Sequence, residues 1–185
     1  MKAGSEGSQC HANAVDPFAS TKARSLPRTT RCAQAHNTMT PQQTAESLGI
    51  KFEKIAPGYL NLCIRSGNQL LSSGHVSDAK GKVGGAGLSV EQGYAAAKNC
   101  AEKILRSVWQ THGTLDGLRV IKVFGCVNTT MEFTDQHLVI NGASDLLHTI
   151  FGKDGDGYHA RSALGFAQLP TGAAVEVEAI FEIKG

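Results

Sequence analysis

The sequence predicts an α+β fold, a two-layer sandwich in which a mixed β-sheet carries two helices on one face. Two long segments place apolar residues at helical spacing, and the runs around them have the alternation or the β-branched content of strands. These elements follow one another in the order β-β-α-β-α-β-β. With both helices on one face, the other face of the sheet is left uncovered.

The first elements are a short helix and a hairpin. A helix is expected over residues 40–48, because Pro41 suits its first turn and Gly49 its end. Strands over residues 60–64 and 69–73 flank the turn-rich tetrad RSGN. We therefore expect these two strands to pair as a hairpin.

A long helix is predicted over residues 89–112. Ser89 and Gln92 form a capping box at its start, and Gly113 follows its last turn. Its apolar residues recur at spacings of three and four, and they are Val90, Tyr94, Ala97, Ala101, Ile104 and Val108. This spacing is typical of a helix that packs one face on a core.

A strand over residues 117–128, a second helix over 134–151 and strands over 161–168 and 174–183 complete the expected fold. The second helix carries an apolar stripe of Val139, Ala143, Leu146 and Ile150. In the last strand apolar residues alternate with Glu176, Glu178, Ile180 and Glu182. The face that carries the acids is either exposed to solvent or, because it also holds an isoleucine, lines the interior of an oligomer.

Residues 1–38 differ in composition from residues 39–185. They hold five basic and two acidic residues, a formal charge of +3, so the remaining residues carry −1 of the total of +2. We expect a leader that is an organellar transit peptide, a disordered tail, or an upstream extension with Met39 as the true start. The protein is then cytoplasmic, or mitochondrial or plastid if the leader is a transit peptide.

Several classes of protein are disfavoured by composition. The chain has no run of about 18 apolar residues, so we expect no membrane span. Its five cysteines lack a C-x-x-C pair and its seven histidines lack an H-E-x-x-H spacing, which predicts no metal site and a reducing compartment. The slightly acidic domain makes nucleic acid an unlikely partner, because nucleic-acid affinity depends largely on neutralising phosphates.

Five segments, in order, resemble the reactive intermediate deaminase A family, also called YjgF or L-PSP endoribonuclease. The segments are GNQLLSSGH at 67–75, SVEQGYAAA at 89–97, VIKVFGCVN at 120–128, VINGASDLL at 139–147, and HARSALGFAQLP with EVEAI within 159–180. The residues in these segments are most similar to the family's chorismate-mutase-like branch. The resemblance covers residues 39–185.

The resemblance implies a homotrimer with three clefts between subunits and a cofactor-independent enamine/imine deaminase. In such an enzyme Arg161 binds the carboxylate of a 2-imino acid and Glu176 orients or activates water. The fork of N–H donors on an arginine suits that role, because it matches a carboxylate bidentately. The products would be a 2-keto acid and ammonia.

The resemblance also assigns the lining of the cleft. Ser73, Asn141 and a tyrosine would contact the substrate. We assign the tyrosine to Tyr59, although Leu60 stands at the aligned position. Ala163 occupies the place of a reactive cysteine in the best-characterised branch, so thiol chemistry at that point is lost.

Three functions remain open from the sequence. A deaminase would release ammonia from short-lived imines, whereas a non-catalytic trimeric binder of small carboxylates, a sensor or chaperone-like partner, would hold a ligand without turnover. Both use Arg161. A ribonuclease is the third interpretation, which the acidic domain and the absence of an aromatic and basic surface disfavour.

Overall fold

A computed structural model of the chain describes residues 39–56 and 58–185. The leader predicted over residues 1–38 lies outside the described residues. The elements are α1 (Pro41–Ser47), β1 (Cys63–Ser66), β2 (Gln69–Ser72), β3 (His75–Val76), α2 (Val90–His112), β4 (Leu118–Asn128), α3 (Gln136–Phe151), a π-helical turn (Gly152–Asp156), β5 (Ala160–Phe166), a 3-10 turn (Pro170–Gly172) and β6 (Val175–Ile183).

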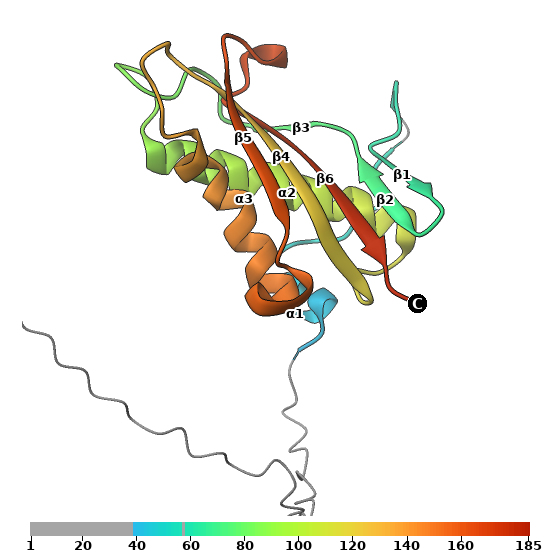
Figure 1. Cartoon of the computed structure of the whole chain (residues 1–185). Helices are drawn as coiled ribbons and strands as arrows, with labels where there is room; N and C mark the ends of the chain where they lie inside the picture. The colour runs from blue at the N-terminus through green and yellow to red at the C-terminus, as the bar shows by residue number, and fades with distance from the viewer. Residues whose placement is uncertain (1–38, 57) are drawn as a thin grey trace, which may run out of the picture. The chain divides into compact units, whose positions relative to one another are not determined.

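The strands form one mixed sheet in the order β1-β2-β6-β4-β5, and β3 pairs with the first half of β6. Only β4 and β5 are parallel, and α3 connects them. Helices α2 and α3 pack against each other on one side of the sheet, and the other side carries no helix among the described elements (Figure 1). The predicted two-layer α+β fold is confirmed.

The predicted start and end of the long helix are confirmed in detail. The backbone N–H of Gln92 donates to Oγ of Ser89 at 3.2 Å, and the N–H of Ser89 donates to Oε1 of Gln92 at 2.9 Å. Gly113 ends α2 in the left-handed conformation, with φ of 94°. These contacts satisfy backbone groups that the helix itself leaves unpaired.

Two expectations for the first strands were wrong. β1 begins at Cys63 rather than residue 60 and continues to Ser66, so the hairpin turn consists of Gly67 and Asn68 alone. Gly67 has φ of 62°, as the first position of a two-residue hairpin turn often requires. β3 was not expected, because a strand of two residues is too short to show a periodicity.

The core fills the space between the sheet and the two helices. Its largest fully buried side chains include Phe181, Leu70, Ile104 and Leu105. Helices α2 and α3 approach closely because Gly142 has no side chain, and a Cβ there would collide with the carbonyl oxygen of Tyr94. No helix in the described part of the chain is long and apolar enough to cross a membrane.

Gly142→Ala should therefore destabilise the protein. Overpacking of a tight contact costs roughly 1–3 kcal/mol or more, and here the colliding atom is backbone, which cannot rotate away. Denaturant titration of the purified variant measures the loss. Gly58→Ala is the matched control, since a Cβ there meets nothing within 4 Å, and equal stability of the two variants would contradict the close contact.

Buried His75 should make stability depend on pH. Its side chain is 6% exposed, Nδ1 donates to the carbonyl oxygen of Ser73 at 2.8 Å, and Nε2 accepts from Oγ of Ser107 at 2.7 Å. Burial lowers the pKa of His75 from its usual 6.5. The unfolded chain therefore binds the proton more readily, so the free energy of unfolding falls as the pH drops below about 6.5.

The measurement is thermal unfolding between pH 7.5 and 5.5. His75→Asn should show a smaller fall in melting temperature across this range than the parent, whereas the same change at exposed His137 should leave the fall unaltered. An identical pH dependence in the parent and in His75→Asn would rule out His75 as its source.

Candidate functional site

The two predicted catalytic residues lie on opposite faces of the sheet. Arg161 of β5 is level with Val123 of β4, whose side chain is buried beneath the helices. Glu176 of β6 is level with Cys126 of β4 and lies on the side without helices. β4 separates β5 from β6 in the sheet. Two strand spacings and three residues of rise place the two Cα atoms roughly 14 Å apart.

Helix α3 holds the guanidinium of Arg161. Nη1 donates to Oδ1 of Asn141 at 2.9 Å and to Oγ of Ser144 at 3.0 Å, and Nη2 donates to the carbonyl oxygen of His137 at 3.3 Å. Residues 137, 141 and 144 are spaced by four and three, so one face of the helix presents all three acceptors. Partial burial lowers the pKa of Arg161, but an arginine remains charged at any physiological pH.

The environment leaves the charge and one edge of Arg161 available. Within residues 39–56 and 58–185, no carboxylate oxygen lies within 4.0 Å of its guanidinium, so its partners are neutral. An arginine has five N–H donors. Asn141 and Ser144 occupy both donors of Nη1, and His137 occupies one of Nη2. In the described part of the chain, Nε and the second N–H of Nη2 have no partner and remain for an anion, and a carboxylate suits two such donors.

Glu176 lines a cavity of about 360 Å³ on the face without helices. Phe124, Phe166 and Leu169 supply apolar walls, and Glu178 also borders the cavity. Burial raises the pKa of Glu176, and the negative charge of Glu178 raises it further. A carboxylate whose pKa is raised toward neutrality is a better general base, because it binds a proton more strongly.

Gly74 determines how closely the chain approaches Glu176. A Cβ at residue 74 would collide with Oε1 of Glu176, so a side chain there would displace the carboxylate. Gly74 directly precedes β3, whose residues His75 and Val76 pair with Val177 and Glu176. The register of β3 on β6 therefore sets the position of this glycine.

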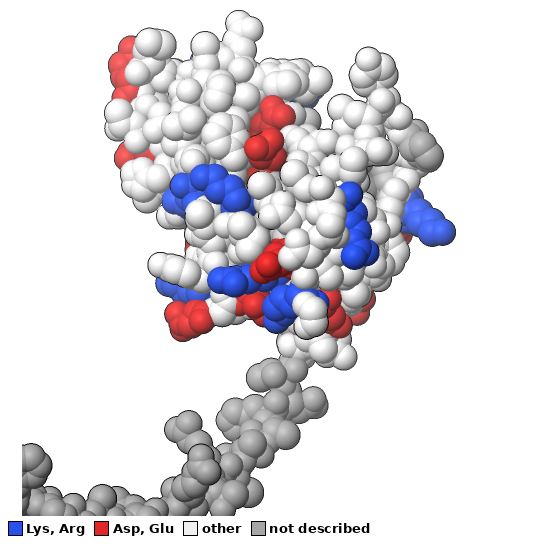
Figure 2. Space-filling view, turned by 45° about the vertical axis from the view of Figure 1, so that its right-hand side comes forward, with Lys and Arg blue, Asp and Glu red and all other residues white. Residues whose placement is uncertain are grey.

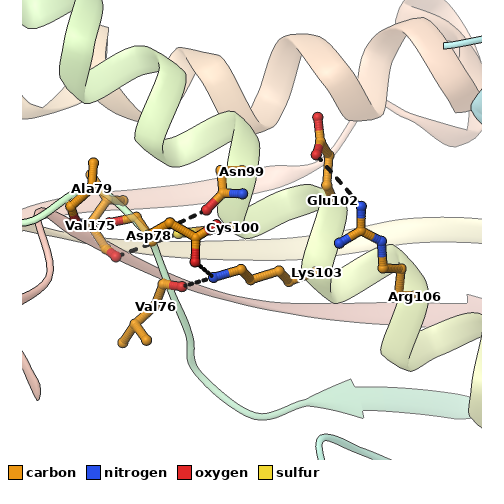
Figure 3. A network of polar contacts seen from close by, with 10 residues as sticks. Val76, Asp78, Ala79, Asn99, Cys100, Glu102, Lys103, Arg106 and Val175 are labelled. Carbon is orange, nitrogen blue, oxygen red and sulfur yellow. Dashed lines mark hydrogen bonds and ion pairs between the residues drawn. The ribbon is translucent and has the colours of Figure 1, made fainter. Parts of the chain in front are cut away.

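Helix α2 fastens β3 in that register (Figure 3). Nζ of Lys103 donates to the carbonyl oxygen of Val76 at 2.8 Å and to Oδ1 of Asp78 at 2.7 Å. The backbone N–H of Asp78 donates to Oδ1 of Asn99 at 3.0 Å. These contacts from α2 explain how a strand of two residues keeps its place.

The cleft residues predicted with Arg161 and Glu176 are not gathered around one group. Asn141 lies beside Arg161, whereas Ser73 is the residue before Gly74, which lies against Glu176. The Ser73 hydroxyl donates to the carbonyl oxygen of Asn61 at 2.7 Å. Tyr59 is fully exposed, and the structure does not bring it to either group. Its role in the cleft stays a prediction.

The sequence analysis did not identify Ser144 and His159 as site residues. Ser144 is buried, and its Oγ lies 3.0 Å from Nε2 of His159. Their spacing could have indicated them, because Ser144 follows Asn141 by three positions on α3 and His159 precedes Arg161 by two residues.

Cysteine chemistry and metal binding find little support in the described residues. Cys63, Cys100 and Cys126 are free. Cys126 borders the Glu176 cavity, but burial, together with Glu176 and Glu178, raises its pKa to about 11, so the thiol stays protonated. No group of three or more histidines, cysteines and acids in the described part of the chain could hold a metal ion.

Two proteins are more than a third identical to this chain in sequence. Protein TCP17 of Trypanosoma cruzi is 43% identical over 149 residues, which cover 75% of this chain and 91% of that protein. The crystal structure of Atu1372 from Agrobacterium tumefaciens, of unknown function, is 38% identical with a TM-score of 0.69, covering 79% of this chain and 94% of that one.

A putative endoribonuclease from Shewanella oneidensis has the same fold. Its TM-score is 0.70 at 24% identity, covering 78% of this chain and 99% of that chain. Residues 53–183 also match the family model described as Endoribonuclease L-PSP. The family resemblance seen in the five sequence segments is confirmed, and the chain belongs to the endoribonuclease L-PSP family.

Proposed function

We propose that the protein is an enamine/imine deaminase that hydrolyses reactive 2-imino acids to 2-keto acids and ammonia. The observation that carries the proposal is the edge of Arg161 that has no hydrogen-bond partner among residues 39–56 and 58–185, a charged fork that suits the carboxylate of such a substrate. Glu176, with its raised pKa, is a suitable base for activating water.

The proposed active site forms between copies of the chain in a homotrimer. Arg161 and Glu176 lie on opposite faces of one sheet, so one chain does not bring them together around a small substrate. The face without helices exposes large apolar side chains, including Ile64 at 56%, Leu164 at 49% and Phe166 at 38%. Covering these side chains with another copy would bury apolar surface. One copy would then supply Arg161 and its neighbour Glu176.

The proposed reaction needs only these side chains and water. Nε–H and Nη2–H of Arg161 bind the substrate carboxylate and fix the neighbouring C=N group. The substrate enters as the protonated imine, and Glu176 removes a proton from water as the water oxygen bonds to the imine carbon, which gives a neutral tetrahedral carbinolamine. Protonated Glu176 then donates that proton to the nitrogen. The C–N bond breaks and ammonia leaves as Glu176 takes the hydroxyl proton, the C=O bond forms, and the proton passes to solvent. Proton transfer of this kind accelerates a reaction by roughly 10² to 10⁴.

A non-catalytic binder of small carboxylates is the second candidate, because Arg161 alone could hold a carboxylate. The endoribonuclease function in the family description finds less support. On the face that Figure 2 shows, lysines, arginines and acids are interspersed on a mostly uncharged surface, without a continuous basic band among the described residues. Nucleic-acid affinity depends on such a band, because phosphate contacts dominate it.

The deciding experiment measures the loss of 2-iminopropanoate with and without the full-length protein. Arg161→Lys should lower kcat/KM roughly 10- to 100-fold, because it keeps the charge and removes the bidentate fork. Glu176→Gln should retain pyruvate binding and lose most turnover. Arg65→Lys on the exposed hairpin is the control for Arg161→Lys and should match the parent. Tight pyruvate binding without turnover by the parent would establish the binder instead.

Glu178→Gln should shift the pH dependence of the reaction. Glu178 raises the pKa of Glu176, so its neutralisation lowers that pKa. A base works only when deprotonated, and the acidic limb of the kcat profile should therefore move to lower pH. Glu182→Gln, farther along the same face of β6, is the control and should leave the limb in place. If the acidic limb of the kcat profile does not move in Glu178→Gln, Glu176 is not the group whose titration produces that limb.

A further inference from the structure

We propose that His159 is a positioning residue, which acts through the hydroxyl of Ser144 to fix the orientation of Arg161. The inference deepens the proposed function, because it concerns the side chain assigned there to the substrate carboxylate. It assigns His159 no contact with substrate.

The backbone selects the tautomer of His159. Nδ1 lies 2.6 Å from the carbonyl oxygen of Gly157, and a carbonyl only accepts, so Nδ1 carries the hydrogen. Nε2 of the neutral ring is then an acceptor. Burial is the largest influence on His159 and lowers its pKa, and His148 and Arg161 lower it further, which favours the neutral ring at pH 7.

Nε2 of His159 in turn orients the hydroxyl of Ser144. With no hydrogen of its own, Nε2 accepts from Oγ of Ser144 across 3.0 Å. Two threonine hydroxyls in helices instead donate to the carbonyl oxygen four residues earlier. Thr44 donates to Thr40 at 2.9 Å, and Thr149 donates to Asp145 at 2.7 Å. His159 therefore diverts Ser144 from the bond that a helical hydroxyl can make to its own helix.

With its hydrogen committed to His159, Ser144 presents a lone pair to Arg161. Oγ of Ser144 accepts from Nη1 at 3.0 Å, and Oδ1 of Asn141 accepts the other hydrogen of Nη1 at 2.9 Å. Two acceptors on one nitrogen prevent the guanidinium from turning about its Cζ–Nε bond. The edge formed by Nε and Nη2 is thus held in one orientation before any ligand binds.

Calorimetry with pyruvate and the full-length protein tests the relay. Ser144→Ala and His159→Phe should each weaken binding about three- to tenfold, the loss expected for one hydrogen bond. His159→Gln, which keeps an acceptor near Nε2, should recover most of the affinity. The double variant Ser144→Ala/His159→Phe should bind no more weakly than Ser144→Ala, because His159 acts only through that serine.

Kinetics and a neighbouring histidine provide the controls. With 2-iminopropanoate, the relay variants should raise KM and leave kcat within about twofold, since neither side chain belongs to the water-activating group. His148→Phe should match the parent, because its ring lies 5.1 Å from that of His159 but is not part of the relay. Additive losses in the double variant, or failure of His159→Gln to restore affinity, would overturn the relay.

A measurement without ligand separates this inference from the proposed function. In ¹⁵N NMR spectra of the free protein, the two terminal nitrogens of Arg161 should give separate signals in the parent and averaged signals in Ser144→Ala, because the freed guanidinium rotates. Separate signals in both proteins would overturn the relay even if Arg161→Lys abolishes pyruvate binding. Averaging in Ser144→Ala alone supports the relay even if no deaminase activity is found.

Discussion

β6 is hydrogen-bonded to β4 along one edge and to β2 and β3 along the other, and its pleat controls the location of the acidic groups. Side chains of a strand alternate between faces, so Val175, Val177 and Ala179 enter the core while Glu176 and Glu178 face away from it. A shift of β6 by one residue would bury the glutamates and expose the core. The separation of Glu176 from Arg161 follows from the same alternation, because Arg161 of β5 faces the helices.

Arg161 and Glu176 are held by different kinds of contact. Arg161 is held from α3 by neutral oxygen atoms, which occupy donors without cancelling its charge. A carboxylate partner would have held it as firmly and would have competed with an anionic ligand. Glu176 instead lies beside Glu178 and apolar walls, surroundings that disfavour its charged form. In the proposed function, Arg161 binds the anion and Glu176 accepts the proton.

Two glycines allow close contacts that connect the packing of the core with Arg161 and Glu176. Gly142 lets α3 lie against α2, and α3 carries the acceptors of Arg161. Gly74 lets the chain before β3 lie against Glu176, and Lys103 of α2 fastens β3. Helix α2 therefore supports both groups, although none of its residues belongs to either. Changes in α2 far from the proposed chemistry should disturb both.

The sequence by itself determined the helices, the alternation of β6 and the family, because these depend on signals within short segments. The capping box of Ser89 and Gln92 and the alternating valines and glutamates are readable without knowing what packs where. Motif matching also identified Arg161 and Glu176 as candidates.

Only the tertiary structure decided how the candidates are placed. It put Arg161 and Glu176 on opposite faces, left Tyr59 in solvent and brought Ser144 to His159, a residue 15 positions away. β3 exists because α2 and β6 hold it, since two residues carry no pattern of their own. Such contacts depend on the packing of α3 against β5 and of α2 against β3, which local sequence patterns do not specify.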